Sequence, residues 1–311
     1  MTDIQSETAF DIFAVNEAAK KDKKKLLSIG EDGINKEVEK TADYIISRGE
    51  ELKIVLVSGR SASGKTTFTK KVCEKLSKMG REAKHISLDD FLLGLGYMPV
   101  NEDGTYDMES IKGLDTALAN ECFGLLLKEG AADFPTFDFP KQRRGEKWNR
   151  IETGENGIIM IEGIHALNPL LTENLPEKGI MKVYIEPEKG YELSGKEVFS
   201  TDEVRLMRRM TRDELFRGWS AEKTLIQWKS VKEGEKIYIE PYVEFADIKV
   251  NTSFMGEPTV FKKILSEMLS VIKEDSGFFD MAQDFLKKLE AFDEIDPNFL
   301  EKDSLLREFV G

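Results

Sequence analysis

The chain has 311 residues, 40% of them hydrophobic and 33% charged, so it can form one large domain, or one domain with appendages, around a sizeable core. Its formal net charge of −13 argues against nucleic acid and anionic membranes as partners, although a few basic residues can still build a local anion site. Two cysteines and two histidines are too few for a disulfide scaffold or a cysteine-rich metal site. The sequence has no basic start followed by an apolar leader, and it has no apolar run long enough for a membrane span, so a cytoplasmic protein is expected.

Residues 1–50 are predicted to form a helical N-terminal extension. Apolar residues recur at helical spacing through its second half, with charged residues between them. Gly30 and Gly33 are expected to separate two helices. The lysine-rich stretch 20–25 is interpreted as a solvated helix face, and a phosphate-binding patch is the alternative.

Residues 51–275 alternate between strand and helix patterns, which indicates an α/β fold with a parallel sheet. The predicted strands are Ile54–Val57, Lys84–Leu88, Gly157–Ile161, Met181–Ile185 and Asp247–Val250. Between them, Thr66–Met79 and Ile111–Lys128 have the periodicity of helices.

The octamer Gly59–Thr66 fits the pattern G-x-x-x-x-G-K-S/T, and it lies between a predicted strand and a predicted helix, as that pattern requires. Its glycines permit positive φ and close approach of a phosphate, and successive N–H groups then face one anion. Lys65 can reach the β- and γ-phosphates, and Thr66 can bind Mg²⁺. The predicted nucleotide-binding residues are Gly59, Ser61, Ala62, Ser63, Gly64, Lys65, Thr66 and Thr67. The expected fold is that of a P-loop NTPase, a three-layer α/β/α sandwich with a mostly parallel central sheet.

Three classes of P-loop protein compete: a small-molecule kinase, a GTPase switch and a remodelling ATPase. No Asn-Lys-x-Asp that could read guanine follows the loop, and the strand Gly157–Ile161 ends in a lone Glu162 instead of paired acids, so a kinase is favoured. A kinase needs a general base, and Asp89 follows the second strand, where strand ends line one crevice. The alternative is that Asp89 or Asp90 only caps a helix.

Residues 187–235 have a charged, helical pattern, and Ser200 with Glu203 three residues later is the capping-box signature of a helix start. Four arginines then share one helix face: Arg205, Arg208, Arg209 and Arg212. Like charges repel unless an anion lies against them, so a helical lid over ATP is predicted at about residues 200–235. The alternative is a solvated face or ion pairs with neighbouring glutamates.

Together these motifs resemble the uridine kinase and phosphoribulokinase family of P-loop kinases, from about Lys53 to Lys273. The segments that carry the resemblance stand in the family's order: Gly59–Thr67, Leu88–Phe91, Tyr106–Asp115, Pro135–Phe139, Ile161–Ile164, Arg208–Gly218, Glu240–Pro241 and Ala246–Asp247. The ending Ser304–Phe309 is similar to a longer bacterial branch of this family.

The resemblance implies a role for each matching residue. Asp89 would be the base, and Lys65, Arg209 and Arg212 would neutralise the moving phosphoryl group. Thr66 would bind Mg²⁺, with Glu162 ordering it. The residues that would hold the acceptor are Asp107, Phe137, Gln142 and Gln227, with Arg217 supporting the lid.

The family resemblance implies an ATP- and Mg²⁺-dependent kinase that forms a nucleoside 5′-monophosphate and ADP, with uridine or cytidine as the first acceptors. Two positions depart from the family: Phe137 stands where a Tyr is usual and Gln142 where a His is usual, both against the pyrimidine base. The alternatives are an ATP-binding regulatory module on a kinase fold, and a kinase for another acceptor such as a sugar phosphate or pantothenate.

Residues 276–311 are predicted to form an acidic, helical C-terminal tail. Its apolar stripe, which includes Phe285 and Phe292, is expected to pack on the core, with docking of a partner as the alternative. The residues leave open whether the chain forms a homo-oligomer.

Overall fold

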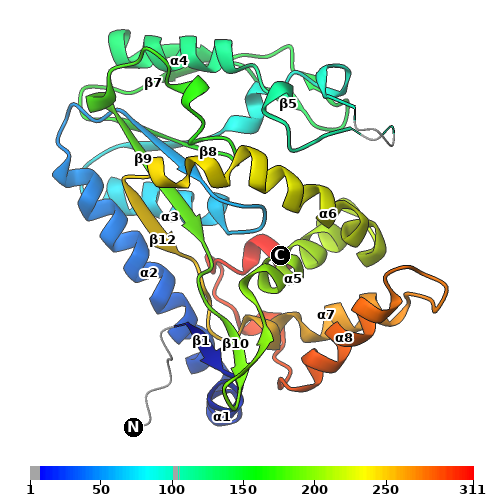
Figure 1. Ribbon diagram of the computed structural model, residues 1–311. Helices are drawn as coiled ribbons and strands as arrows, with labels where there is room; N and C mark the ends of the chain where they lie inside the picture. The colour runs from blue at the N-terminus through cyan, green and yellow to red at the C-terminus, as the bar shows by residue number, and fades with distance from the viewer. Residues whose placement is uncertain (1–7, 101–103, 105) are drawn as a thin grey trace.

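A five-stranded parallel sheet forms the centre of the computed structural model, which describes residues 8–100, 104 and 106–311 (Figure 1). Its strands lie in the order β12-β9-β2-β8-β3. Their bounds are Ile54–Ser58 (β2), Ala83–Ser87 (β3), Ile158–Glu162 (β8), Ile180–Glu186 (β9) and Ile248–Asn251 (β12). The five predicted strands are confirmed, each to within a residue or two. Each strand pairs in parallel with its neighbour, so all carboxyl ends meet at one edge.

Alternate residues of these strands face two hydrophobic cores, as the period-two geometry of a strand requires. Val55 and Val57 of β2 lie on one side, and Ile54 and Leu56 lie on the other. On the first side lie α2 (Lys23–Ser47) and α3 (Lys65–Lys78), whose core also includes residues of α5 (Thr201–Arg212) and α7 (Glu257–Ser270), and on the second lies α4 (Thr116–Glu129). The predicted three-layer α/β/α P-loop NTPase fold is thereby confirmed.

Two small antiparallel sheets stand beside α4 at the top of Figure 1. One pairs β4 (Ala131–Phe134) with β7 (Asn149–Glu152), and the other pairs β5 (Phe137–Asp138) with β6 (Arg143–Arg144). The rings of Phe91, Phe123 and Phe134 pack against one another beneath them, with centroids 5.4 to 6.4 Å apart. This packing ties the turn after β3 to the second core.

The N-terminal extension contains a short strand and two helices: β1 (Ala9–Asp11), α1 (Ile12–Lys21) and α2. The expected break at Gly30 and Gly33 is wrong, because α2 runs through both glycines. Gly30 is instead a packing position, since a Cβ there would lie 2.4 Å from the ring of Phe254. The lysine-rich stretch 20–25 is exposed on the helices, and residues 1–7 lie outside the described part of the chain.

The helical pattern expected over residues 187–235 is wrong in its first part. A hairpin of β10 (Gly190–Leu193) and β11 (Lys196–Phe199) stands there, and β10 also pairs in parallel with β1. Ser194 and Gly195 take positive φ at its turn. The helix start is confirmed, because Ser200 and Glu203 form a capping box at the beginning of α5.

The segment for which a lid is predicted consists of α5, a π-helical turn at Asp213–Arg217 and α6 (Ala221–Tyr238). No helix in the described part of the chain is long and apolar enough to cross a membrane.

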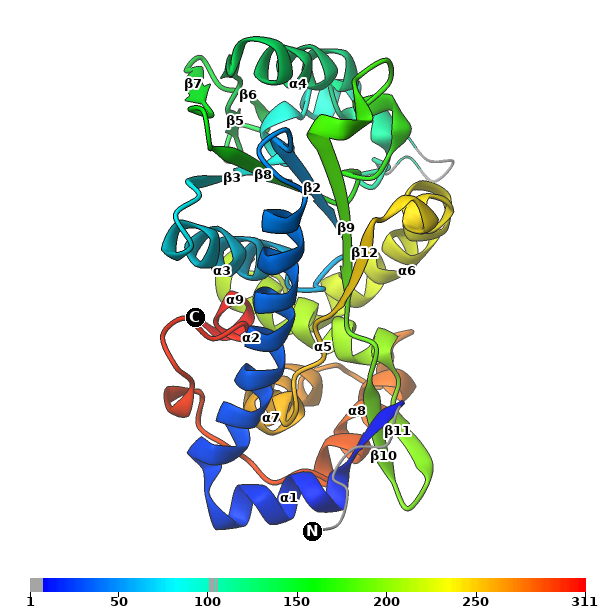
Figure 2. The ribbon, with the colours of Figure 1, turned by 90° about the vertical axis from the view of Figure 1, so that its left-hand side faces the viewer.

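The C-terminal segment is only partly helical, which corrects the expectation of a helical tail. Between α8 (Phe279–Glu290) and the short α9 (Arg307–Val310) the chain has no long helix and runs back along the molecule toward α3 (Figure 2). Its apolar residues pack into the same core as the sheet: Phe285, Leu289, Phe292, Ile295, Leu300, Leu305, Leu306 and Phe309. The stripe is therefore covered by the chain itself.

Candidate functional site

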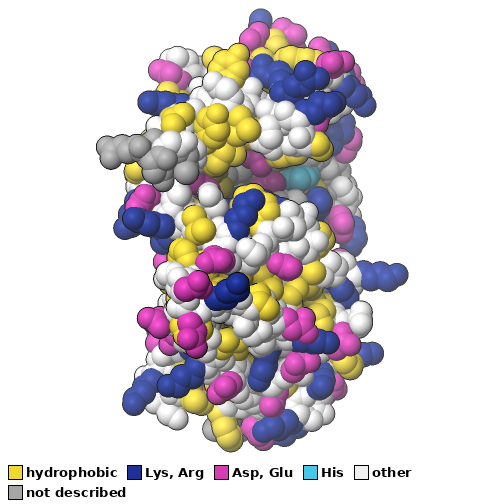
Figure 3. Space-filling view, turned by 90° about the vertical axis from the view of Figure 1, so that its right-hand side faces the viewer, with side chains coloured by type: hydrophobic (Ala, Val, Ile, Leu, Met, Phe, Trp, Pro, Cys, Tyr) yellow, Lys and Arg dark blue, Asp and Glu magenta, His cyan; other side chains and the backbone are white. Residues whose placement is uncertain are grey.

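A cavity of about 600 Å³ lies at the carboxyl ends of β2, β3 and β8. Sequence-predicted residues from all parts of the site line it: Ser61, Ala62, Lys65, Thr66, Asp89, Phe137, Gln142, Glu162, Arg209, Arg212, Arg217 and Gln227. On the corresponding face of the molecule, acidic side chains and a histidine are visible in a hollow between two lobes (Figure 3). The parallel topology gathers these side chains, because it brings strand ends together.

The loop between β2 and α3 has the backbone that phosphate binding requires. Gly64 takes φ 86° immediately before α3 begins at Lys65, and Ala62 takes φ 60°. Gly59 passes so close to β9 that a Cβ would lie 2.2 Å from the carbonyl oxygen of Ile185. Side chains at these glycines would either strain the loop or collide with the sheet. The N–H groups of the first turn of α3 are therefore presented as an anion cradle.

Lys65 lies folded onto this loop. Its Nζ donates hydrogen bonds of 3.0 Å to the carbonyl oxygens of Gly59 and Arg60. Burial lowers the pKa of Lys65, while the carboxylate of Glu162 counteracts that effect. The ammonium group is thus held at the loop, where it can transfer its hydrogen bonds to phosphate oxygens.

Thr66 and Glu162 supply hard oxygen atoms next to the loop. The Thr66 hydroxyl donates to Glu162 Oε1 at 3.0 Å, and His85 Nε2 lies 3.6 Å from the same oxygen. Burial raises the pKa of Glu162, but His85 and Lys65 lower it by more, so the carboxyl titrates below its usual range.

The described residues contain no group of three or more His, Cys, Asp or Glu side chains that could hold a metal. One hydroxyl and one carboxylate nevertheless fit Mg²⁺, which in kinases takes few protein ligands and completes its shell with phosphates and water.

The adjacent residues Asp89 and Asp90 differ in what their side chains contact. Asp90 Oδ1 accepts a hydrogen bond from the Phe137 N–H at 3.4 Å, whereas Asp89 points to the cavity. Neither caps a helix, because the side chain of Ser87 accepts the N–H of Asp89 at the start of the 3-10 turn Leu88–Phe91. The Asp89 side chain is exposed to the water of the cleft. Desolvation by the surrounding protein, and after it the negative charge of Glu162, raise the pKa of Asp89 to about 6.

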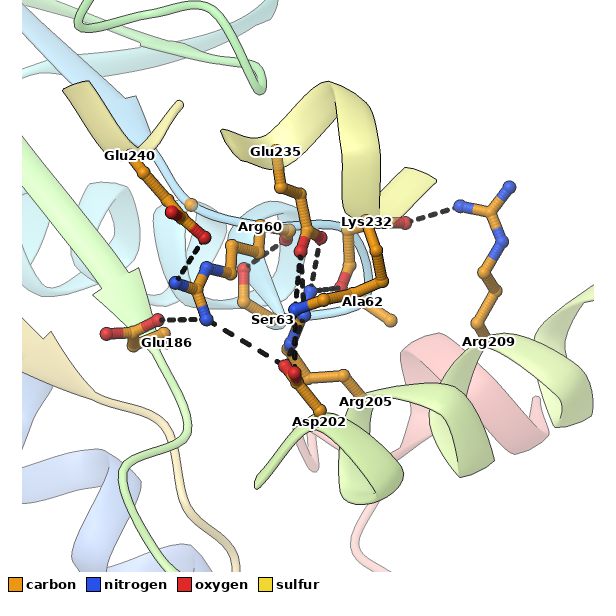
Figure 4. A network of polar contacts seen from close by, with 12 residues as sticks. Arg60, Ala62, Ser63, Glu186, Asp202, Arg205, Arg209, Lys232, Glu235 and Glu240 are labelled. Carbon is orange, nitrogen blue, oxygen red and sulfur yellow. Dashed lines mark hydrogen bonds and ion pairs between the residues drawn. The ribbon is translucent and has the colours of Figure 1, made fainter. Parts of the chain in front are cut away.

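The four arginines of α5 divide into two pairs. Arg205 and Arg208 are buried in ion pairs, as the alternative to a lid predicted: Arg205 donates to both carboxylate oxygens of Glu235 at 2.5 and 2.9 Å, and Arg208 donates to both of Glu257 at 2.6 and 3.0 Å. Figure 4 shows Arg205 between Glu235 and Asp202, beside the loop residues Ala62 and Ser63. These two side chains anchor the helix and do not line the cavity.

Arg209 and Arg212 do line the cavity, together with Arg217 from the π-helical turn. Arg209 donates to the hydroxyl of Ser61 at 2.6 Å, which ties α5 directly to the phosphate loop. Asp213 is fully buried between Arg209 and Arg217, at 3.5 and 2.9 Å, and holds both guanidinium groups. The cavity therefore has a cationic wall opposite Asp89.

Phe137, Gln142 and Gln227 also line the cavity. The ring of Phe137 packs edge-on against Phe139, with centroids 5.1 Å apart, and Gln142 Nε2 donates to the carbonyl oxygen of Phe139 at 2.7 Å. An aromatic face and two neutral amides thus meet in one half-enclosed space.

Asp107 is not among the lining residues. Its carboxylate accepts hydrogen bonds from the Tyr238 hydroxyl at 3.1 Å and the Glu109 N–H at 3.2 Å. Glu109, two residues further on, lines the cavity instead. Spacing alone does not show which of two nearby carboxylates faces inward, because residues 106–110 form an irregular turn.

Three titratable residues that the sequence did not assign to the site also line the cavity: Glu109, His165 and Glu308. Desolvation raises the pKa of Glu109 to about 7, although Arg209 opposes the shift, and burial lowers the pKa of His165 to about 4. Both groups therefore add neutral or weakly charged polar surface at neutral pH. Glu308 comes from the C-terminal end of the chain, and no local motif indicates that it belongs to the site.

A parallel sheet with a glycine-rich loop between β2 and α3, and a paired hydroxyl and carboxylate at the same edge, defines a P-loop NTPase site. The family model described as "Phosphoribulokinase / Uridine kinase family" matches residues 54–255. The chain belongs to this family, and it is therefore a P-loop kinase.

Named proteins are similar to the chain over most of their length. A uridine kinase from Deinococcus deserti is 25% identical over 208 residues, which span 67% of this chain and 91% of the relative. A uridine kinase from Borrelia duttonii is 26% identical over 234 residues, spanning 73% of this chain and 99% of the relative. A solved structure titled as a possible uridine kinase from Bacillus stearothermophilus covers 70% of this chain and 98% of its own, with 14% identity and a TM-score of 0.48.

Proposed function

We propose that this kinase transfers the γ-phosphoryl group of ATP to the hydroxyl of a nucleoside, with uridine or cytidine as the first acceptors. One observation carries the proposal: a single cavity contains the phosphate loop, a carboxylate with raised pKa, a cationic wall and an aromatic pocket with neutral amides. Those are the parts that phosphoryl transfer to an alcohol needs.

The phosphates of ATP would lie on the N–H groups of the loop, with Lys65 turning from the carbonyl oxygens of Gly59 and Arg60 to the β- and γ-phosphates. Thr66 and Glu162 would hold Mg²⁺. The bound ion would supply positive charge that offsets the negative charge of the phosphates.

Asp89 would take the proton from the acceptor hydroxyl as that oxygen attacks the γ-phosphorus. Its raised pKa suits a general base, because a carboxylate that titrates near the working pH is a better proton acceptor. Arg209 and Arg212 would stabilise the charge on the transferring group, and their fixed positions on α5 avoid reorganisation during the reaction.

The acceptor would lie against Phe137, with Gln142 and Gln227 as neutral hydrogen-bonding partners. A pyrimidine offers an aromatic face and amide-like edges, so it matches these groups. Glu109 takes the place that family resemblance gives to Asp107, because its side chain faces the cavity, and a carboxyl there would accept hydrogen bonds from sugar hydroxyls.

The test is ADP release by the purified chain with ATP and Mg²⁺, with and without a panel of acceptors. The panel holds four ribonucleosides, a sugar phosphate and pantothenate. Stimulation by uridine or cytidine supports the proposal. Stimulation by only a sugar phosphate or pantothenate would replace the acceptor, and ATP binding without stimulation by any of them would point to a regulatory module.

A further inference from the structure

The C-terminal segment lies directly on the phosphate loop. Leu305, Leu306 and Phe309 are completely buried, and a Cβ on Gly64 of the loop would lie 3.0 Å from a methyl group of Leu305. Phe309 lies beneath the guanidinium group of Arg208, 5.4 Å from ring centroid to carbon. The segment is therefore a packed part of the nucleotide site rather than a loose end.

Within this segment, Glu308 reaches into the anion cradle. Its Oε2 accepts a hydrogen bond from the N–H of Thr67 at 3.0 Å, and its Oε1 lies 3.8 Å from Arg212. The side chain is only 13% exposed and lines the same cavity as Lys65 and Asp89. A carboxylate is thus bound where the loop presents its donors.

The N–H of Thr67 belongs to the first turn of α3, whose free N–H groups bind phosphate oxygens in loops of this kind. A phosphate oxygen that needed this N–H would meet the Glu308 carboxylate at hydrogen-bonding distance. The two anions exclude each other, because the site has one donor at that position and like charges repel.

We propose that Glu308 is an internal occupant of the phosphate loop, which a nucleoside triphosphate displaces when it binds. The backbone of the segment stays in place, since Arg307 donates to the carbonyl oxygens of Glu301, Leu300 and Gly311 and the neighbouring leucines are buried. The Glu308 side chain turns away, and Arg212 is released toward the phosphates. The choice of a triphosphate as the ligand rests on the proposed function. The contact between the Glu308 carboxylate and the loop is the same whichever acceptor the kinase uses.

In the empty protein Glu308 compensates the positive charge of Arg212 and of the loop. Binding of a triphosphate must first break these contacts, so the carboxylate weakens the apparent affinity. A charge-assisted hydrogen bond is stronger than a neutral one by about the free energy of one decade in affinity. Replacement of the carboxylate by an amide is expected to strengthen triphosphate binding roughly ten-fold.

The experiment is titration calorimetry of the full chain with Mg²⁺·ATP and, separately, with inorganic triphosphate. The variants are Glu308→Gln, which removes the charge at nearly constant shape, and Glu308→Asp, which keeps the charge but shortens its reach. Glu301→Gln is the matched control, because it removes one charge from an exposed position of the same segment.

Tighter binding of both ligands by the two Glu308 variants, with the Glu301 control equal to wild type, is the expected result. Unchanged or weaker binding in Glu308→Gln would overturn the proposal and make Glu308 a neutral or constitutive part of the site. Inorganic triphosphate carries no nucleoside and needs no acceptor, so this result is independent of the acceptor panel.

Discussion

Asp89 and Asp90 are neighbours in the chain but have separate tasks in the fold. Asp90 accepts the N–H of Phe137 and thereby fixes the strand that bears this aromatic ring, which lines the cavity. Asp89 stands free in the cleft, with a pKa raised to about 6 by desolvation and by Glu162. The first residue shapes the pocket, and the second is available for chemistry.

The raised pKa of Asp89 predicts how the activity depends on pH. A general base works only as the carboxylate, so kcat/KM for the acceptor should fall with unit slope as the pH drops below about 6 and level off above it. Steady-state rates from pH 5 to 9, with Mg²⁺·ATP binding measured in parallel, check this. The residual rate of an Asp89→Asn variant should lack the acidic limb; a limb that persists there would assign it to another group.

At this scale the motif residues of the loop were predictable, because the pattern Gly59–Thr66 dictates its own backbone. Glu109 was not, since residues 106–110 form an irregular turn in which spacing does not determine direction. Glu308 was not predictable either, because its contact with Thr67 joins residues 241 positions apart.

Helix α5 carries two functions on neighbouring residues. Arg205 and Arg208 point into the protein, where Glu235 of α6 and Glu257 of α7 neutralise them, and Arg209 and Arg212 reach the cleft. Helical periodicity predicted one arginine face, but the division of that face depends on partners from distant helices. The buried pairs anchor α5 to α6 and α7.

Loss of one partner of such a pair should destabilise the fold. Glu257→Gln leaves the buried charge of Arg208 without its counter-ion, and a decrease of about 3–5 kcal/mol in the free energy of unfolding is expected. Denaturant unfolding measures it. Glu244→Gln is the control, because Glu244 and Lys249 form an exposed pair at 2.7 Å that should contribute less than about 1 kcal/mol. Equal effects in both variants would contradict this view of α5.

Two features were predicted wrongly from the sequence, and each error has a physical reason. The β10–β11 hairpin is short and charged, so its sequence shows neither the apolar run of a buried strand nor a strong alternation of apolar and polar residues. Its strand β10 is stabilised by pairing with β1, which is far away in the sequence. Gly30 resembled a helix break but is needed for contact with Phe254. Tertiary packing overrides local propensity at both places.

At the scale of the molecule, three stretches of the chain share one hydrophobic core. Apolar residues of α1 and α2, of one face of the sheet and of the C-terminal segment all belong to it. Phe292 illustrates this, since its ring packs against Tyr191 and Phe199 of the hairpin, with centroids 5.3 and 5.8 Å apart. The C-terminal segment thus supports the fold and carries Glu308 to the loop.

A shared core predicts cooperative unfolding. Phe292→Ala should lower the free energy of unfolding by about 3–5 kcal/mol, as large-to-small changes at buried aromatic residues do. The loss should appear in one transition seen alike by tryptophan fluorescence and circular dichroism. Val271→Ala is the control, because Val271 is 72% exposed, and this change should alter the free energy of unfolding by less than about 0.5 kcal/mol. Two separate transitions in the wild-type chain would show that the C-terminal segment folds on its own.

The proposed reaction depends on Asp89, which would activate an alcohol beside a triphosphate held on the loop. Its most direct test is the Asp89→Asn variant, assayed for ATP binding and for acceptor-stimulated ADP release with the best acceptor of the panel. Because the Asp89 side chain is exposed in the cleft, the neutral variant should be as stable as wild type. We expect unchanged ATP affinity and a loss of roughly two to four decades in turnover; normal turnover would contradict the account.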